Sequence, residues 1–154
     1  LTGVKVTAQS TCAPEYGAVL ALDGDPDPYQ AWISKPYGGG AKAKPVDVWW
    51  TVEFLKHPVV LKGVKIIGDH RGNIPLQKNL QVQTREGGQW KTIGELKNAA
   101  TKDVTITFAQ PVTTDAFRVF IPAADIPSDG YVRICEIAAI LPDGSETTFN
   151  KLIP

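Results

Sequence analysis

The chain has 154 residues, of which 43% are hydrophobic and 21% are charged, values typical of a single globular domain with a sizeable core. Its 16 basic side chains balance its 16 acidic ones, which argues against a nucleic-acid-binding protein, because that class usually carries a basic surplus. No apolar run reaches the roughly 18 residues that a membrane-spanning helix needs.

The predicted elements are almost all strands. Short runs of β-branched and aromatic residues alternate with Gly, Pro, Asn and Asp, and one helical turn is expected over Tyr16–Leu22. The predicted strands are, in chain order, Val4–Ala8, Asp47–Phe54, Val59–Ile67, Asn79–Thr84, Trp90–Leu96, Asp103–Ala109, Ala116–Ile121, Val132–Leu141 and Glu146–Phe149. About eight or nine strands at this spacing predict an all-β sandwich or barrel, as a single domain over residues 1–154.

Two long loops interrupt the strands, at Ile33–Val46 and at Gly68–Lys78. Strand connections in a compact sandwich are usually shorter, and loops of this length more often carry function. These two loops are therefore the first places in which to look for a binding site.

The stretch "ALDGDPDPYQAW" places three carboxylates, Asp23, Asp25 and Asp27, at alternate positions of a turn-rich loop. Calcium prefers six to eight oxygen ligands from carboxylates and backbone carbonyls. Gly24 permits a sharp turn, and the prolines leave carbonyls free to point inward. The alternative is a solvated Asp-Gly and Asp-Pro turn, which is a common use of these residues.

The two cysteines, Cys12 and Cys135, leave two interpretations open. They form a disulfide between an early and a late segment, or they are separate buried thiols. The sequence has no Cys-x-x-Cys motif or Cys/His cluster, so a zinc site is not expected.

Further motifs accompany the acidic loop, in the order "TAQS", "WWTVEF", "VKIIG", "NLQVQTREGGQWKTI", "FRVFI" and "GYVRICEIAAI". Together they resemble the discoidin, or coagulation-factor type C, domains and the related galactose-binding-like carbohydrate-binding modules. The resemblance covers nearly the whole chain. It implies a galactose-binding-like β-sandwich of jelly-roll type.

The resemblance also implies a structural calcium ion at the acidic loop. Carried over by position, its ligands are the carbonyls of Leu20, Asp25 and Cys135, the carboxylates of Asp23 and Glu136, and position 28. The family's threonine at that position is Pro28 here, which removes one oxygen ligand. Either Asp27 or water replaces it, or the site is weaker or binds sodium.

Family members that bind sugars use a shallow surface of loops at one end of the sandwich. Sugar recognition needs an aromatic face for the ring and planar polar groups for the hydroxyls. The loop "GDHRGN" offers four such polar groups, and two tyrosines lie at suitable positions. The expected ligand-binding residues are Tyr37, Asp69, His70, Arg71, Asn73 and Tyr131. The alternative for the loop is a plain polar surface.

An enzyme is not expected, because neither of the two histidines lies in a nucleophile motif and there is no phosphate-cradling loop. The chain begins at Leu1 and contains no methionine, which suggests a mature form or an excised fragment. The leading hypothesis is a non-catalytic carbohydrate-binding module from a secreted multidomain enzyme that acts on polysaccharide. Such a module is extracellular or periplasmic, lies beside neighbouring domains of its parent enzyme, and is expected to be a monomer.

Two alternative functions remain at this point. One is an adhesion domain of discoidin type that binds protein or acidic membrane, and the other is an accessory domain that only packs against its neighbour. The loop tips "KPYGGGAK" and "DHRGN" contain few apolar residues, which favours sugar over membrane.

Overall fold

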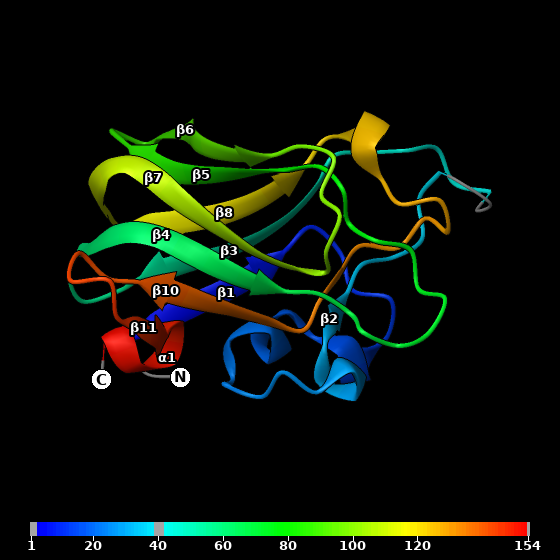
Figure 1. The fold of residues 1–154 in the computed structure, drawn as a ribbon, viewed down its shortest axis with the longest axis horizontal. Helices are drawn as coiled ribbons and strands as arrows, with labels where there is room; N and C mark the ends of the chain where they lie inside the picture. The colour runs from blue at the N-terminus through cyan, green and yellow to red at the C-terminus, as the bar shows by residue number, and fades with distance from the viewer. Residues whose placement is uncertain (1–2, 39–41, 154) are drawn as a thin grey trace.

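Two antiparallel sheets packed face to face form the protein in a computed structural model, which describes residues 3–38 and 42–153 (Figure 1). The described strands are β1 (Val4–Ala8), β2 (Trp32–Ile33), β3 (Val48–Phe54), β4 (Val59–Ile67), β5 (Leu80–Glu86), β6 (Gln89–Leu96), β7 (Asp103–Thr114), β8 (Ala116–Ile121), β9 (Arg133–Ile134), β10 (Glu136–Ile140) and β11 (Glu146–Thr148). The helical elements are the 3₁₀ turns η1 (Pro14–Tyr16), η2 (Ala18–Leu22), η3 (Pro28–Gln30) and η4 (Ala123–Asp125), and the short helix α1 (Phe149–Leu152).

The strand order confirms the predicted β-sandwich. One sheet has the order β1-β3-β8-β5-β6, the second has the order β11-β10-β4-β7, and β2 and β9 form a small pair beside them. The described chain has 11 strands, slightly more than the eight or nine predicted. The predicted strand Val132–Leu141 is divided at Cys135, because Ile134 pairs with β2 whereas Glu136 pairs with β4. The strand β2 was not predicted, since two residues are too short to show a pattern.

The period of two along β3 decides which tryptophan enters the core. Trp50 is fully buried between the sheets, whereas Trp49 is half-buried on the outer face of the five-stranded sheet. Trp32 is also fully buried, and its indole Nε1 donates a hydrogen bond of 3.0 Å to the carbonyl of Ser10. The buried tryptophan therefore fixes the chain that follows the acidic loop to the segment that follows β1.

The last element, α1, closes one end of the sandwich. Its first residue, Phe149, is fully buried, and its ring stacks on Phe54 and Phe117 at centroid distances of 5.9 and 5.6 Å. Gly3 lies so close to Ile153 that an added Cβ would be 2.2 Å from the Ile153 carbonyl oxygen. Both termini consequently lie at the end of the sandwich away from the long loops (Figure 1).

None of the helices in the described part of the chain has the length and apolar character that a membrane crossing requires.

Replacing Phe149 with alanine is expected to lower the free energy of unfolding by about 3 to 5 kcal/mol, because it removes a fully buried ring and leaves a cavity. Urea-induced unfolding measures this change. The control is Leu55→Ala, whose side chain is 57% exposed, with an expected loss below about 1 kcal/mol. Equal losses in the two variants would contradict the packing described for α1.

Candidate functional site

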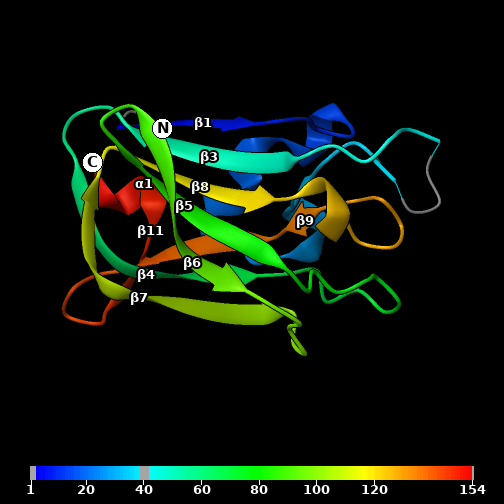
Figure 2. The same cartoon turned by 90° about the horizontal axis from the view of Figure 1, so that it is seen from above.

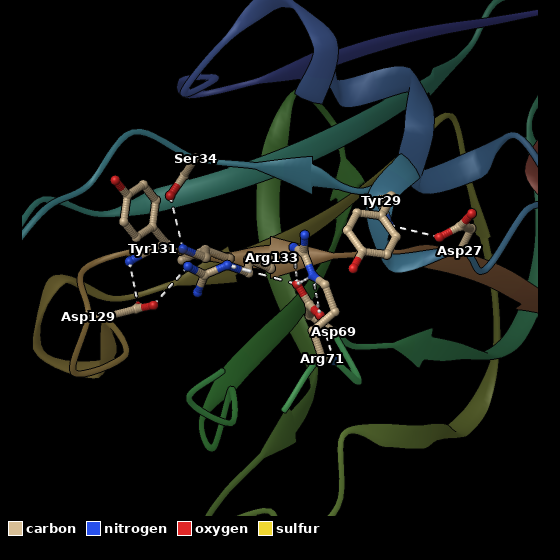
Figure 3. A network of polar contacts seen from close by, with 9 residues as sticks. Asp27, Tyr29, Ser34, Asp69, Arg71, Asp129, Tyr131 and Arg133 are labelled. Carbon is tan, nitrogen blue, oxygen red and sulfur yellow. Dashed lines mark hydrogen bonds and ion pairs between the residues drawn. The ribbon is translucent and has the colours of Figure 1, made fainter. Parts of the chain in front are cut away.

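A group of charged and aromatic side chains gathers where the loops meet at one end of the sandwich (Figure 3). Asp69 and Arg71 come from the loop that follows β4, and Arg133 opens β9. Tyr131 and Asp129 come from the loop before β9. We call these five residues the loop-end cluster.

Asp69 is the buried centre of the loop-end cluster, with 4% of its surface exposed. Its carboxylate accepts a hydrogen bond of 2.9 Å from the backbone N–H of Arg71. It also accepts hydrogen bonds from the side chain of Arg71, from Nε at 3.0 Å and from Nη2. Burial opposes ionisation of Asp69, but these hydrogen bonds and the charges of Arg71 and Arg133 outweigh it and lower the pKa of the carboxyl. The carboxylate in turn raises the pKa of Arg71. The buried carboxylate of Asp69 therefore fixes the orientation of the Arg71 side chain.

Arg133 is held on its other side by the loop before β9. Its Nη2 lies 2.8 Å from an Asp129 carboxylate oxygen, its Nε lies 4.0 Å from Asp69, and its guanidinium lies 4.8 Å from the centre of the Tyr131 ring. Ser34 fixes this loop, because its buried hydroxyl accepts a hydrogen bond of 3.0 Å from the backbone N–H of Val132. The position of Tyr131 thus depends in part on Ser34, which is close to it only in the folded chain.

Tyr29 connects the loop-end cluster to the acidic loop. The Arg71 guanidinium lies 5.0 Å from the centre of the Tyr29 ring, and this tyrosine is 71% exposed. Together with four residues of the cluster, Tyr29 therefore forms a row in which Tyr29, Arg71, Asp69, Arg133 and Tyr131 follow one another. Both ends of the row are aromatic, and its middle is polar.

A small pocket adjoins Asp69, Tyr131 and Arg133, with Ile74, Pro75, Leu76 and Pro127 among its other lining residues. Its volume is about 20 Å³, which is enough for little more than one water molecule. A ligand would therefore lie across the surface, with at most one small group inserted between the loops.

Three of the predicted ligand-binding residues lie outside the loop-end cluster. His70 is exposed and its Nε2 lies 2.6 Å from a carboxylate oxygen of Asp103. Asn73 is exposed near the tip of its loop. Tyr37 packs against the main core, and its hydroxyl accepts a hydrogen bond of 3.2 Å from Gln9. The cluster brings together only Asp69, Arg71 and Tyr131 from the prediction.

The sequence did not single out Arg133, Asp129 or Tyr29. Asp129 and Arg133 are four residues apart and flank Tyr131, and this Asp-x-Tyr-x-Arg spacing was the available signal. Tyr29 gave no signal of its own, because its position in the acidic loop was interpreted through the carboxylates.

The acidic loop is organised by its own carboxylates. The Oδ1 atom of each aspartate accepts a hydrogen bond from the backbone N–H two residues later in the chain. The backbone N–H of Asp25 donates to Asp23, that of Asp27 to Asp25 and that of Tyr29 to Asp27, at 2.8 to 3.0 Å. Such turns are the ordinary structural use of aspartate in loops. They use one oxygen atom of each side chain and leave the second one for another partner.

Glu136 faces the acidic loop from the start of β10. Its Oε2 accepts a hydrogen bond of 3.0 Å from the backbone N–H of Gly24, a residue with a left-handed φ of 88°. Its Oε1 is buried without any hydrogen-bond partner among the described residues. Burial, together with the nearby Asp23 and Asp25, raises the pKa of Glu136 to about 8. The side chain is thus a buried acid whose ionised form would have no positively charged partner in the described chain.

The remaining predicted calcium ligands come from the acidic loop, which contains Asp25, and from the segments next to it and to Glu136. Leu20 lies in η2, Pro28 begins η3, and Cys135 precedes Glu136. No three His, Cys, Asp or Glu side chains within residues 3–38 and 42–153 are grouped as metal ligands. A cation here would therefore depend on backbone carbonyls and water for many of its ligands.

Both cysteines are free thiols in the structure. Cys135 is fully buried in a small cluster with Ala31 and Ile33, and Cys12 packs against the same cluster. Burial raises the pKa of Cys135 to about 12, so its thiol stays protonated and unreactive at neutral pH. Of the two interpretations of the cysteines, the structure has the one without a disulfide.

In the presence of chelator, the free energy of unfolding is expected to decrease as the pH rises from about 4.5, the usual pKa of a glutamate, to about 8, the pKa of Glu136 in the folded chain. The folded protein holds a proton in this range that the unfolded chain releases, so the stabilisation is complete below the lower value and is lost above the higher one. Urea-induced unfolding at a series of pH values measures the slope.

Glu136→Gln should reduce this slope, because the variant has no carboxyl to titrate, whereas Glu15→Gln, at an exposed position in η1, should retain it. The same slope in Glu136→Gln as in the original protein would contradict the assignment.

Comparison with known proteins gives one family and a consistent set of folds. The family model of the F5/8 type C domain matches residues 5–137. A search of curated proteins gave no match. The family 32 carbohydrate-binding module of NanJ from C. perfringens, solved in complex with galactose, is 18% identical with a TM-score of 0.70, and the alignment covers 88% of this chain and 92% of that one.

Two further solved structures share the fold. Chitosan-binding module 1, derived from a chitosanase/glucanase of Paenibacillus sp. IK-5, is 19% identical with a TM-score of 0.66, covering 88% of this chain and 92% of that one. The F5/8 type C domain of a Bacteroides fragilis protein is 22% identical with a TM-score of 0.66, covering 88% and 89%. These similarities confirm the predicted galactose-binding-like sandwich.

Proposed function

Because this chain belongs to the F5/8 type C domain family, the family that its sequence motifs resemble, we propose that it is a non-catalytic carbohydrate-binding module. The solved structures that share its fold include a module in complex with galactose and a chitosan-binding module. We propose further that it is extracellular or periplasmic, and that it is a monomer that lies beside neighbouring domains of a parent enzyme acting on polysaccharide.

The single observation that supports this function best is the row that the loop-end cluster forms with Tyr29. Tyr29 and Tyr131 offer aromatic faces for the apolar side of a sugar ring, and the two arginines between them offer planar donors for its hydroxyls. The shallow pocket beside the cluster suits a ligand that lies on the surface. Such a site makes few contacts, so we expect weak affinity for one sugar, with useful binding through avidity or a tethered enzyme.

Replacing Tyr131 with alanine is expected to weaken glycan binding by about tenfold, which corresponds to about 1.4 kcal/mol, because the variant loses one aromatic face. A glycan array and affinity electrophoresis in galactan and chitosan gels identify the ligand and measure the loss. The control is Lys62→Ala in β4, outside the loop-end cluster, which should bind as the original protein does.

The double variant Asp69→Asn/Arg71→Gln tests the polar half of the cluster. It removes both charges at once, so that no buried carboxylate is left without its partner, and it should also lose binding. Unchanged binding in both the Tyr131 variant and the double variant would mean that the sugar binds elsewhere.

We propose also that a structural calcium ion binds between the acidic loop and Glu136. The supporting observation is the buried Glu136 Oε1, which has no partner in the described chain and lies near Asp23 and Asp25, so that the ionised carboxylate would need a cation beside it. Asp23 and Glu136 would supply carboxylate oxygens, and the carbonyls of Leu20, Asp25 and Cys135 would supply others. The proline at position 28 offers no hydroxyl, so we expect water or Asp27 in that place.

Added calcium should raise the melting temperature of the original protein, and chelator should lower it, because the ion binds the folded chain alone. Asp23→Ala and Glu136→Gln should abolish the response. Asp143→Ala removes an exposed carboxylate from the turn between β10 and β11 and should leave it intact. If neither calcium nor chelator changed the melting temperature of the original protein, the proposed calcium site would be contradicted.

A further inference from the structure

The outer face of the five-stranded sheet carries an aromatic and cationic group that the loop-end site does not use. The strand register places Trp49 opposite Phe120, Arg118 opposite Gln83, and Trp90 opposite Arg85. The residues between them in sequence, such as Trp50 and Phe117, point into the core and are fully buried. The alternation therefore puts these large side chains on the outer surface of β3, β8, β5 and β6.

Arg118 lies between two tryptophan rings on this face. Its guanidinium is 4.7 Å from the centre of the Trp49 ring and 4.0 Å from that of Trp90. Its Nε donates a hydrogen bond of 3.0 Å to the hydroxyl of Thr51, and its two Nη atoms have no hydrogen-bond partner in the described chain. The stacking fixes the direction of the guanidinium before any ligand binds.

No carboxylate of the described residues lies within ion-pair distance of Arg118, whereas the neighbouring arginine is fully paired. Arg85 lies 2.8 Å from Asp115 and 3.6 Å from Glu53. Burial and the charge of Arg85 lower the pKa of Arg118, as they do for a cation without a counter-ion. Arg118 is therefore an oriented positive charge that lacks an anion.

A row of amide and hydroxyl groups continues the surface beside Arg118. Gln83 Nε2 donates to Gln81 Oε1 at 3.2 Å and to Thr92 Oγ1 at 3.3 Å, and Thr92 Oγ1 donates to the same Gln81 oxygen at 3.1 Å. These contacts hold the side chains in place at the surface. Planar amides can donate and accept hydrogen bonds to sugar hydroxyls, and the aromatic rings beside them can contact the apolar face of the sugar ring.

The apolar groups of this face are half-buried aromatic rings, and the guanidinium of Arg118 lies between two of them. In Figure 2 the strands β5 and β6 lie in front, and α1 lies behind them. The exposed large hydrophobic residues among those described are Val19, Tyr29, Leu55 and Val60, and none lies on these strands. A protein partner usually requires a continuous apolar interface core, whereas here a cation separates the aromatic rings and amide and hydroxyl groups adjoin them, so this surface is better suited to a glycan.

We propose that the outer face of the five-stranded sheet is a second glycan-binding surface, which takes an acidic polysaccharide. Its uronate carboxylate pairs with the Nη atoms of Arg118, and its neighbouring rings lie against Trp49 and Trp90. This surface is on the strands, away from the loop-end cluster, and it is independent of the site in the proposed function.

Affinity electrophoresis in gels that contain polygalacturonate, alginate or hyaluronate tests the proposal on the original domain and on Asp69→Asn/Arg71→Gln. Both proteins should be retarded by at least one of these uronate polymers, because the loop-end cluster is not needed. Arg118→Gln should weaken this retardation at least tenfold, whereas Lys62→Gln, which loses the same charge from β4 in the other sheet, should not. Circular dichroism and the melting temperature establish that each variant is folded.

Tryptophan fluorescence gives a second measurement that needs no substitution. Uronate polymer should protect the half-buried Trp49 and Trp90 from quenching by acrylamide, since Trp32 and Trp50 are already fully buried. Absence of binding to all three uronate polymers would overturn the proposal. The proposal would also be overturned if the loop double variant bound carboxyl-reduced polygalacturonate as strongly as polygalacturonate. Binding of polyglutamate, which has carboxylates without sugar rings, as strong as that of the uronate polymers would overturn it as well.

Discussion

The change of strand partner at Cys135 is the constraint on which both candidate sites depend. Up to Ile134 the chain pairs with β2, and from Glu136 it pairs with β4. Cys135 lies at the junction, fully buried, and its N–H donates to the carbonyl of Ile67. A change of sheet within three residues leaves Arg133 on the side of the loop-end cluster and Glu136 on the side of the acidic loop.

The same segment explains why the two sites are rigidly related. Trp32 pairs with Ile134 and is fully buried, so the end of the acidic loop is fixed to the strand that bears Arg133. Tyr29 then reaches from the acidic loop to Arg71. An ion that orders the acidic loop would therefore also order one aromatic end of the loop-end cluster, without touching a sugar.

Two buried carboxylates show how the surroundings determine charge. Asp69 and Glu136 are both 4% exposed, and burial alone opposes the ionisation of each. Two arginines face Asp69 and lower its pKa, whereas Glu136 faces further carboxylates and its pKa is raised. The first is an internal ion pair that orients Arg71, and the second is suited to a cation. Arg118 is the opposite case, a stacked guanidinium for which the described chain supplies no carboxylate.

The sequence by itself determined the class of fold, most strand positions, the family and the acidic loop. Alternation and turn residues are local signals, and the family motifs occur in order along the chain. It also singled out Asp69, Arg71 and Tyr131, which the folded chain brings together at one end of the sandwich. Only the tertiary structure decided which residues join them, because Arg133, Asp129 and Tyr29 meet through the pairing of β2 with β9 and through loop packing. It likewise separated Tyr37 and His70 from the cluster and brought Trp49, Arg118 and Trp90 together, since contacts between distant segments depend on strand register and not on local pattern.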